Sequence, residues 1–230
     1  MKDAFLSAIS EAFAKSELVR EGEVNKRDHL RRLDSMYYQG DAIVHWSLTI
    51  RNRATGWLSE LFHLRFRELL THSCFRYEIA CPIYCLMPDH FHMLWIGLSD
   101  SSDQLLAMKH FRKTTNDSLE KNGFELQDQG YDHVLCDDER EAEGFRGVFE
   151  YIARNPERAN LLAQDSFASY PYTSCVIPGY PELVMFSVDF WDRLDRIISF
   201  LRTAGLIRTV SHQGGNVVNG GLKRNWPLTS

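Results

Sequence analysis

The first residues with an obvious chemical use are two histidines, His90 and His92, separated by Phe91. They lie in residues 87–95, where a Met-Pro-Asp turn leads into an apolar run, and this pattern predicts a turn followed by a strand. Side chains two positions apart in a strand share a face, so the imidazoles would project together while Phe91 enters the core. Such a pair supplies half of a divalent-metal site, although two histidines on the solvated face of a half-buried strand show the same spacing.

A tyrosine and an asparagine four positions apart form a second group. Tyr151 and Asn155 would share one face of a helix. Asn155 precedes Pro156, which disfavours helix at the residue before it and suits the first turn of a new helix. Asn155 can therefore also be interpreted as the N-cap of a helix over residues 156–162, and Tyr151 as a half-buried aromatic residue.

The densest basic cluster in the middle of the chain contains Lys109, Arg112 and Lys113. Residues 101–103 predict an N-cap, and a helix is expected over residues 104–121. The cluster is either a face that contacts phosphates or an ordinary solvated face of that helix.

Periodicity in the rest of the chain predicts the elements that would hold these groups. Runs rich in β-branched and aromatic residues predict strands, and apolar residues recurring every three or four positions predict helices. The expected strands cover residues 42–50, 75–86, 90–97 and 131–135, with the second and third forming an antiparallel hairpin. The expected helices cover residues 1–35, 58–74, 104–121, 145–152 and 189–206. Residues 164–181 are expected to be a loop, and residues 209–230 a largely disordered tail.

Five acidic residues fall within residues 137–143. They form either an acidic patch or the start of the helix that continues through residues 145–152. We prefer the helix, because negative charge is stabilised at the positive end of the helix dipole.

Composition limits the class of protein. The 230 residues suit one domain with extensions, and no apolar run approaches the roughly 20 residues that a membrane helix needs. The N-terminus lacks a secretory hydrophobic region, and the five cysteines are expected to be buried free thiols in a reducing cytoplasm. The net charge of −5 argues against a broadly basic nucleic-acid binder, so any phosphate contact needs a local basic patch.

Taken in order, these motifs resemble the single-tyrosine HUH transposases, and more closely the branch associated with repetitive extragenic palindromes (REP). The motifs are Met-Pro-Asp before His-Phe-His, the basic helix, Tyr-Asp-His at 131–133, Tyr-Ile-Ala-Arg-Asn-Pro at 151–156, and Ser-Tyr-Pro-Tyr at 169–172. The resemblance implies an α+β, ferredoxin-like catalytic domain over residues 38–176, in which helices pack on an antiparallel sheet. Residues 1–37 and 177–208 would be N-terminal and C-terminal helical extensions, followed by the tail at 209–230.

The resemblance also implies a site and a reaction. His90 and His92 fall on the histidines of the HUH motif, Asn155 on the polar residue that completes a site for Mg²⁺ or Mn²⁺, and Tyr151 on the nucleophile. The implied activity is that of a DNA transposase or endonuclease-like strand transferase, which cleaves and rejoins single-stranded or hairpin DNA through a 5′-phosphotyrosine intermediate. The basic residues expected to contact the DNA backbone are Arg51, Arg53, Lys109, Arg112, Lys113, Arg154 and Arg158.

The chemistry agrees with these residue types. Phosphoryl transfer needs positioning and charge neutralisation, which a metal supplies. A free phenol, with a pKa of about 10, needs a nearby cation or base to become a good nucleophile. His133 matches a recurring position of the family, and we expect it to make a structural hydrogen bond.

Partners and location follow from the same resemblance. We expect single-stranded or hairpin DNA as the partner, a possible homodimer, no membrane, and a bacterial cytoplasmic location at the nucleoid. Two other functions stay open. One is a catalytically idle DNA-hairpin-binding regulator derived from a transposase, and the other is a metal-dependent hydrolase of small phosphoesters.

Overall fold

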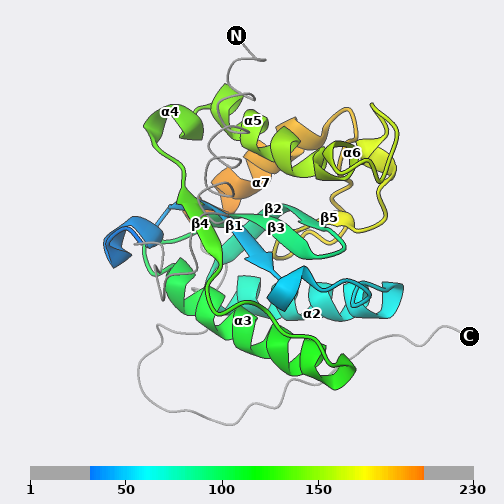
Figure 1. Ribbon diagram of the computed structural model, residues 1–230. Coiled ribbons are helices and arrows are strands. Elements are labelled where there is room, and N and C mark those ends of the chain that lie inside the picture. Colours follow the sequence, from blue (N-terminus) through cyan, green and yellow to red (C-terminus); the bar gives the residue numbers. More distant parts are fainter. Residues whose placement is uncertain (1–31, 205–230) are drawn as a thin grey trace, which may run out of the picture.

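The computed structural model describes residues 32–204, which form three layers. A five-stranded antiparallel sheet lies between two long helices on one face and a second group of helices on the other (Figure 1). The fold class is therefore α+β, as expected. The expected helix over residues 1–35 falls almost entirely outside the described residues, and the expected tail over 209–230 falls wholly outside them.

The centre of the fold is a β-α-β-β-α-β unit with ferredoxin-like topology. The sheet order is β4-β1-β3-β2-β5, and every neighbouring pair is antiparallel. The elements of the unit are β1 (Ile43–Thr49), α2 (Glu60–Arg76), β2 (Ile79–Leu86), β3 (His90–Gly97), α3 (Gln104–Leu119) and β4 (Tyr131–Val134). The short strand β5 (Thr173–Val176) extends the sheet beyond β2.

The remaining elements connect and cover the sheet. Within residues 32–204, the short 3-10 helices are η1 (Ser35–Tyr38), η2 (Arg51–Arg53), η3 (Glu120–Asn122) and η4 (Phe167–Ser169). The other α-helices are α4 (Asp137–Arg140), α5 (Ala142–Ala153), α6 (Asn155–Arg158) and α7 (Phe190–Ala204).

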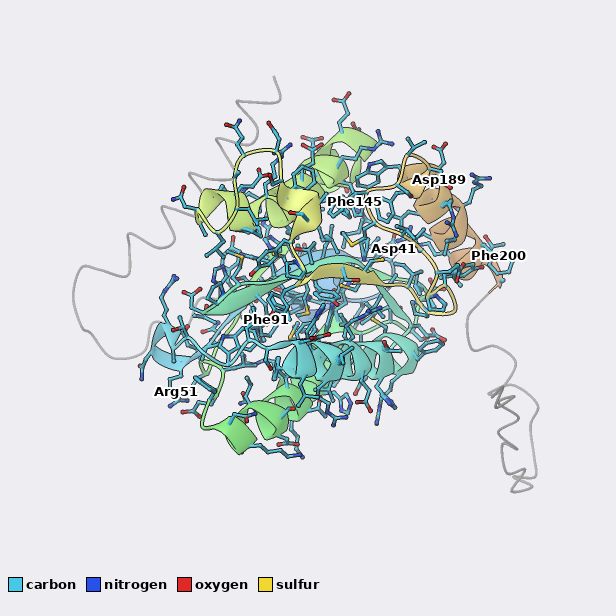
Figure 2. All side chains as sticks on the ribbon, turned by 90° about the vertical axis from the view of Figure 1, so that its right-hand side faces the viewer. Asp41, Arg51, Phe91, Phe145, Asp189 and Phe200 are labelled. Atoms are coloured by element: carbon cyan, nitrogen blue, oxygen red, sulfur yellow. The ribbon has the colours of Figure 1, made fainter. Side chains whose placement is uncertain are left out.

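Alternation along the strands divides the interior into two cores. Trp46 of β1 and Phe91 of β3 face α2 and α3, where Phe91 packs with Phe66 and Phe111. The intervening residues, such as Leu94, face α5 and α7. In Figure 2, Phe91 lies between the sheet and α2, while Phe145 lies on the opposite side of the sheet. Because side chains alternate along a strand, His90 and His92 must face the α5 side.

The ends of the two long helices are set by conventional caps. The Ser59 side chain accepts a hydrogen bond from the backbone N–H of Phe62, and Asp103 accepts one from Leu106. Such caps satisfy N–H groups that have no partner within the helix. In β2, Pro82 lies where the register shifts between Ala80 and Ile83, which is where a residue without an N–H is tolerated in an inner strand.

Four expectations need correction. The strand expected over residues 75–86 begins at residue 79, because residues 75 and 76 complete the last turn of α2. The acidic stretch does not begin one continuous helix, because Glu141 has an extended backbone (ψ 156°) that separates α4 from α5. The expected loop over 164–181 contains η4 and β5. Asn155 does not cap α6 but is its first residue, with Arg154 at the N-cap position.

The cysteines and the C-terminal helix agree more closely with expectation. All five cysteines are free, and all except Cys136 are buried. Helix α7 packs on the same core as α5, through contacts that include Phe149 with Phe190. The C-terminal extension is thus a structural part of the α5 layer. The proposed domain boundaries remain predictions.

Candidate active site

An open cleft of about 280 Å³ lies at the end of β1 and the start of β3, on the α5 side of the sheet. It brings together residues from both strands, from the segment leading into β4, and from α5 and α6. The cleft is lined by Ser47, Thr49, Arg53, Met87, His90, His92, Gln127, Gln129, Tyr131, Tyr151, Asn155, Arg158 and Ala159. Residues expected from the His-Phe-His motif and from the Tyr151–Asn155 pair therefore meet in one place.

A chain of side-chain contacts orients the histidines. Asp89 Oδ1 lies 2.6 Å from His90 Nδ1, and His90 Nε2 lies 3.1 Å from His92 Nε2. The hydrogen bond from His90, together with Arg53, outweighs burial and lowers the pKa of Asp89 to about 2. The ionised carboxylate can only accept, so Nδ1 of His90 donates to Asp89, and Nε2 of His90 faces His92.

The second histidine is buried and neutral. His92 is 4% exposed, and burial lowers its pKa well below the usual value, with the neighbouring His90 and His45 acting in the same direction. His45 Nε2 lies 3.1 Å from His92 Nδ1. Neutral imidazoles are the form that binds metals, so the environment favours the ligating state of His92.

Tyr151 comes from the buried face of α5 and lies beside this chain of histidines. Its ring centroid is 6.2 Å from that of His92 and 6.0 Å from that of His45, and both pairs are edge-on. The neighbours Ile152 and Ala153 are fully buried in the α5 core and hold this part of the helix against the sheet. The tyrosine thus reaches the histidines of its own chain.

Asn155 is positioned by the break between α5 and α6. Its Nδ2 donates hydrogen bonds to the carbonyls of Tyr151 and Ile152, each at 3.2 Å. These two bonds use both amide hydrogens and leave Oδ1 as an acceptor at the cleft. Pro156, which has no N–H, follows in the first turn of α6, where no donor is needed.

The donor set fits a divalent cation held by nitrogen and oxygen. Within residues 32–204, no group of three or more His, Cys, Asp and Glu side chains could hold a metal, so the candidate ligands are two imidazoles and one amide oxygen. Two ligand atoms that each lie about 2.1 Å from one ion at right angles are about 3 Å apart. The 3.1 Å between the Nε2 atoms of His90 and His92 matches that separation.

The charge of the cleft differs from that of the whole chain. The chain has a net charge of −5, but the described residues that line the cleft include Arg53 and Arg158 and no acidic residue. Arg53 pairs with Asp89 at 3.0 Å, and Arg158 lies over the ring of Tyr151. Arg53 and Arg158 are therefore the basic residues of the cleft lining, and the charge of Arg53 is balanced in part by Asp89.

The other basic residues expected to contact DNA do not line the cleft. Arg51 pairs with Glu125 and Asp128, and Arg154 pairs with Glu157 and Asp165. The cluster of Lys109, Arg112 and Lys113 lies on α3, which packs on the opposite face of the sheet from the histidines. Of these three, Arg112 is connected to the cleft because its guanidinium donates to the carbonyl of Gln127.

Several residues of the site were missed by the sequence analysis. His45, Ser47 and Thr49 occupy alternate positions of β1 and share a face with His92, since Ser47 is its partner in the register. The polar alternation in an otherwise apolar strand was a usable signal. Gln127, Gln129 and Tyr131 follow the same alternation, but only the fold reveals which element they face. His133 makes the expected hydrogen bond, to Glu139 at 2.8 Å.

Comparisons with known proteins give a structural relative. No protein-family model matches the chain, and no curated protein matches it. A solved structure of a REP-associated tyrosine transposase bound to a REP hairpin superposes with a TM-score of 0.53 at 17% sequence identity. The match covers 64% of this chain and 82% of that chain. At this identity the likeness establishes the fold. No helix in the described part of the chain is long and apolar enough to cross a membrane.

Proposed function

We propose that this protein is a metal-dependent strand transferase that cleaves and rejoins single-stranded or hairpin DNA through a covalent bond to Tyr151. The observation that carries the proposal is the convergence of Tyr151, Asn155 and the imidazoles of His90 and His92 on one cleft. The lining of this cleft contains two arginines and no acidic residue. The fold shared with a REP-associated tyrosine transposase supports the reaction class.

His90, His92 and Asn155 would hold the metal in this proposal. Nitrogen ligands suit Mn²⁺ better than Mg²⁺, which prefers oxygen, but either ion is compatible with the mixed set. When bound, the ion would neutralise charge on the phosphate that is transferred. Asp89 contributes by fixing the His90 ring, as carboxylates commonly do for metal-bound histidines.

The protein's own residues supply the nucleophile and the positioning. The Tyr151 oxygen forms a bond to phosphorus, and the bond from phosphorus to the 3′ oxygen of the preceding nucleotide breaks. The phenolic proton is released, and the departing 3′ oxygen takes up a proton to become a hydroxyl. The resulting 5′-phosphotyrosine retains the energy of the broken bond, so a 3′-hydroxyl can reverse the reaction and rejoin a strand.

The DNA partner is supported by charge and by the structural relative. Arg53 and Arg158 place positive charge beside the histidines, where a phosphate would lie in this mechanism. The relative was solved with a REP hairpin. One chain is sufficient for the proposed chemistry, because Tyr151 and His92 of the same chain share the cleft.

The direct test is covalent capture of a labelled oligonucleotide. Wild-type protein mixed with a panel of 5′- and 3′-labelled single-stranded hairpins should form an adduct that survives denaturing electrophoresis, and only with Mn²⁺ or Mg²⁺ present. Tyr151→Phe should abolish the adduct and still bind the hairpin. Tyr37→Phe is the matched control, because Tyr37 is 53% exposed and does not line the cleft. An undiminished adduct in Tyr151→Phe would remove this residue from the reaction.

A second function is a hairpin-binding regulator without catalysis. It is favoured by one observation: the candidate metal site within residues 32–204 contains two imidazoles and an amide, without a carboxylate or a third histidine. This alternative predicts salt-dependent hairpin binding and no adduct with any divalent metal.

A further inference from the structure

His45 is a buried polar residue that the proposed reaction does not yet use. It lies in the middle of β1 and is 1% exposed. Its Nε2 is 3.1 Å from Nδ1 of His92, at the opposite end of the ring from His90. A buried imidazole in an apolar strand needs a hydrogen-bond partner, and here that partner is itself a candidate metal ligand.

With all three imidazoles neutral, the contacts of His92 with His90 and His45 permit two proton arrangements. In the first, His92 carries its proton on Nε2 and donates to His90, while His45 donates from Nε2 to Nδ1 of His92. In the second, His92 carries its proton on Nδ1 and donates to His45, so the lone pairs of His92 Nε2 and His90 Nε2 face each other at 3.1 Å. Two facing lone pairs repel, so the second arrangement requires a cation between them.

We propose that His45 is a positioning residue that holds His92 in the tautomer protonated on Nδ1 and thereby presents its Nε2 to the metal. This inference rests on the metal site of the proposed function. A metal-bound histidine usually donates its other N–H to a carboxylate, a carbonyl or water. Asp89 has that role for His90, and Nε2 of His45 has it for His92.

The sheet fixes this contact. β1 and β3 are paired along their length, with Ser47 opposite His92 and His45 opposite Leu94. His45 and His92 are thus diagonal neighbours on the same face of two hydrogen-bonded strands, and their ring centroids are 5.2 Å apart. The His45 backbone is also paired with β4, so the ring is supported from both sides.

The change from the first proton arrangement to the second leaves the total charge of His92 and His45 unchanged. When the cation binds, the Nε2 proton of His92 is released to solvent, and the proton shared by the two rings moves from His45 to Nδ1 of His92. His45 takes up one proton from solvent on Nδ1, so the total number of protons on the two rings is unchanged. Both imidazoles remain neutral in both arrangements.

The first measurement needs no substitution. In wild-type protein with ¹⁵N-labelled histidine, two-bond ¹H–¹⁵N spectra should show His92 protonated on Nε2 without metal and on Nδ1 with saturating Mg²⁺, which is diamagnetic. His45 should change from Nε2-protonated to Nδ1-protonated in the same titration. A His92 tautomer that does not change between the two conditions would overturn the inference.

The second measurement uses variants and Mn²⁺ binding followed by electron paramagnetic resonance. His45→Phe removes the acceptor and should weaken Mn²⁺ binding about 10- to 100-fold, the usual cost of losing an outer-shell partner. His45→Gln places an amide oxygen near the position of Nε2 and should recover most of the affinity. His63→Gln is the matched control, because His63 contacts Tyr84 in the opposite core.

The outcomes separate this inference from the proposed function. Unchanged Mn²⁺ affinity in a folded His45→Phe overturns the role of His45 but leaves the strand transferase intact if the adduct still forms. If wild-type protein binds neither Mn²⁺ nor Mg²⁺, the inference fails, and the adduct assay alone decides the proposed function. If His45→Phe does not fold, His45→Gln and the wild-type spectra remain decisive.

Discussion

The guanidinium of Arg158 lies over the face of the Tyr151 ring, with its Cζ atom 3.9 Å from the ring centroid. The same guanidinium donates a hydrogen bond to the Tyr151 backbone carbonyl, so it is anchored to the residue that it covers. A cation over an aromatic face stabilises the ring's position by about 0.5–2 kcal/mol. In the proposed reaction, the same charge would also stabilise the phenolate that attacks phosphorus.

We therefore expect Arg158→Ala to slow adduct formation by about 100- to 1,000-fold, a typical cost of losing one electrostatic group at a reacting centre. Arg158→Lys should recover part of the rate, because it keeps the charge but loses the planar stacking. Single-turnover adduct formation with a labelled hairpin measures both. Arg65→Ala is the control, since Arg65 is an exposed partner of Glu68 and does not line the cleft. Equal rates for wild type and Arg158→Ala would exclude this role.

Stability should depend on pH through His63. Burial lowers the pKa of His63 to about 4, and its Nε2 lies 2.8 Å from the hydroxyl of Tyr84. The unfolded chain has the ordinary histidine pKa of about 6.5, so the unfolded state binds the proton first as the pH falls. The stabilising contribution is present above about pH 6.5 and is lost as the pH falls toward 4. Urea unfolding from pH 4 to 7 should show a smaller pH dependence in His63→Gln than in wild type.

His72 supplies the matched control for that measurement. It lies on the same helix but is exposed. His72→Gln should leave the pH dependence of unfolding as it is in wild type. If His63→Gln and wild type lose stability in parallel over this range, His63 is not the group responsible.

Gly97 should tolerate no side chain. A Cβ atom at this position would lie 1.8 Å from the backbone oxygen of Gly40, and backbone cannot move aside as a flexible side chain can. Gly97→Ala should cost about 3 kcal/mol or more. Gly123→Ala is the contrast, because its Cβ would meet nothing within 4 Å and only its positive φ of 79° is strained, at about 1–2 kcal/mol. Denaturant unfolding measures the loss of stability in each variant. If Gly97→Ala and Gly123→Ala shift the denaturant midpoint by the same amount, the Cβ at position 97 does not clash with the Gly40 backbone.

Arg53 at the cleft and the two lysines of α3 should contribute differently to the salt dependence of DNA binding. The difference is measured with a short oligonucleotide that fills only the cleft. Arg53→Ala should lower the slope of log affinity against log salt by about one, because one phosphate contact is lost. Lys109→Ala combined with Lys113→Ala should leave that slope unchanged, because α3 lies on the other face. A loss of slope in the double variant would mean that DNA reaches α3.

Much of this architecture was predictable from local pattern. Runs of β-branched, aromatic and apolar residues located β1 and β3 to within a residue, and helical spacing and an N-cap signal located α2 and α3 to within two. The face occupied by α3 was not predictable, because a basic helix has the same sequence pattern on either side of a sheet. Strand β5 was missed because it is set by its pairing with β2, a long-range contact that the local sequence does not reveal.

The candidate site also contains residues that local sequence predicts and residues that only the tertiary structure reveals. His90, His92, Tyr151 and Asn155 were found from spacing and from an ordered resemblance. His45 was not found, because its importance depends on the register between β1 and β3, which no local pattern encodes. The different surroundings of Arg158, over Tyr151, and Arg154, between two carboxylates, likewise depend on tertiary packing.

His92 belongs to a strand whose backbone is paired on both sides, with Ser47 of β1 and with Cys85 of β2. Displacing β3 would break its backbone hydrogen bonds to both β1 and β2. Helix α5, in contrast, contacts the sheet through apolar side chains. In the proposed reaction, a rearrangement between cleavage and rejoining would therefore cost least if α5, which carries Tyr151, moves and β3 stays in place. Amide hydrogens along β3 should accordingly exchange with solvent far more slowly than those of the α5–α6 junction.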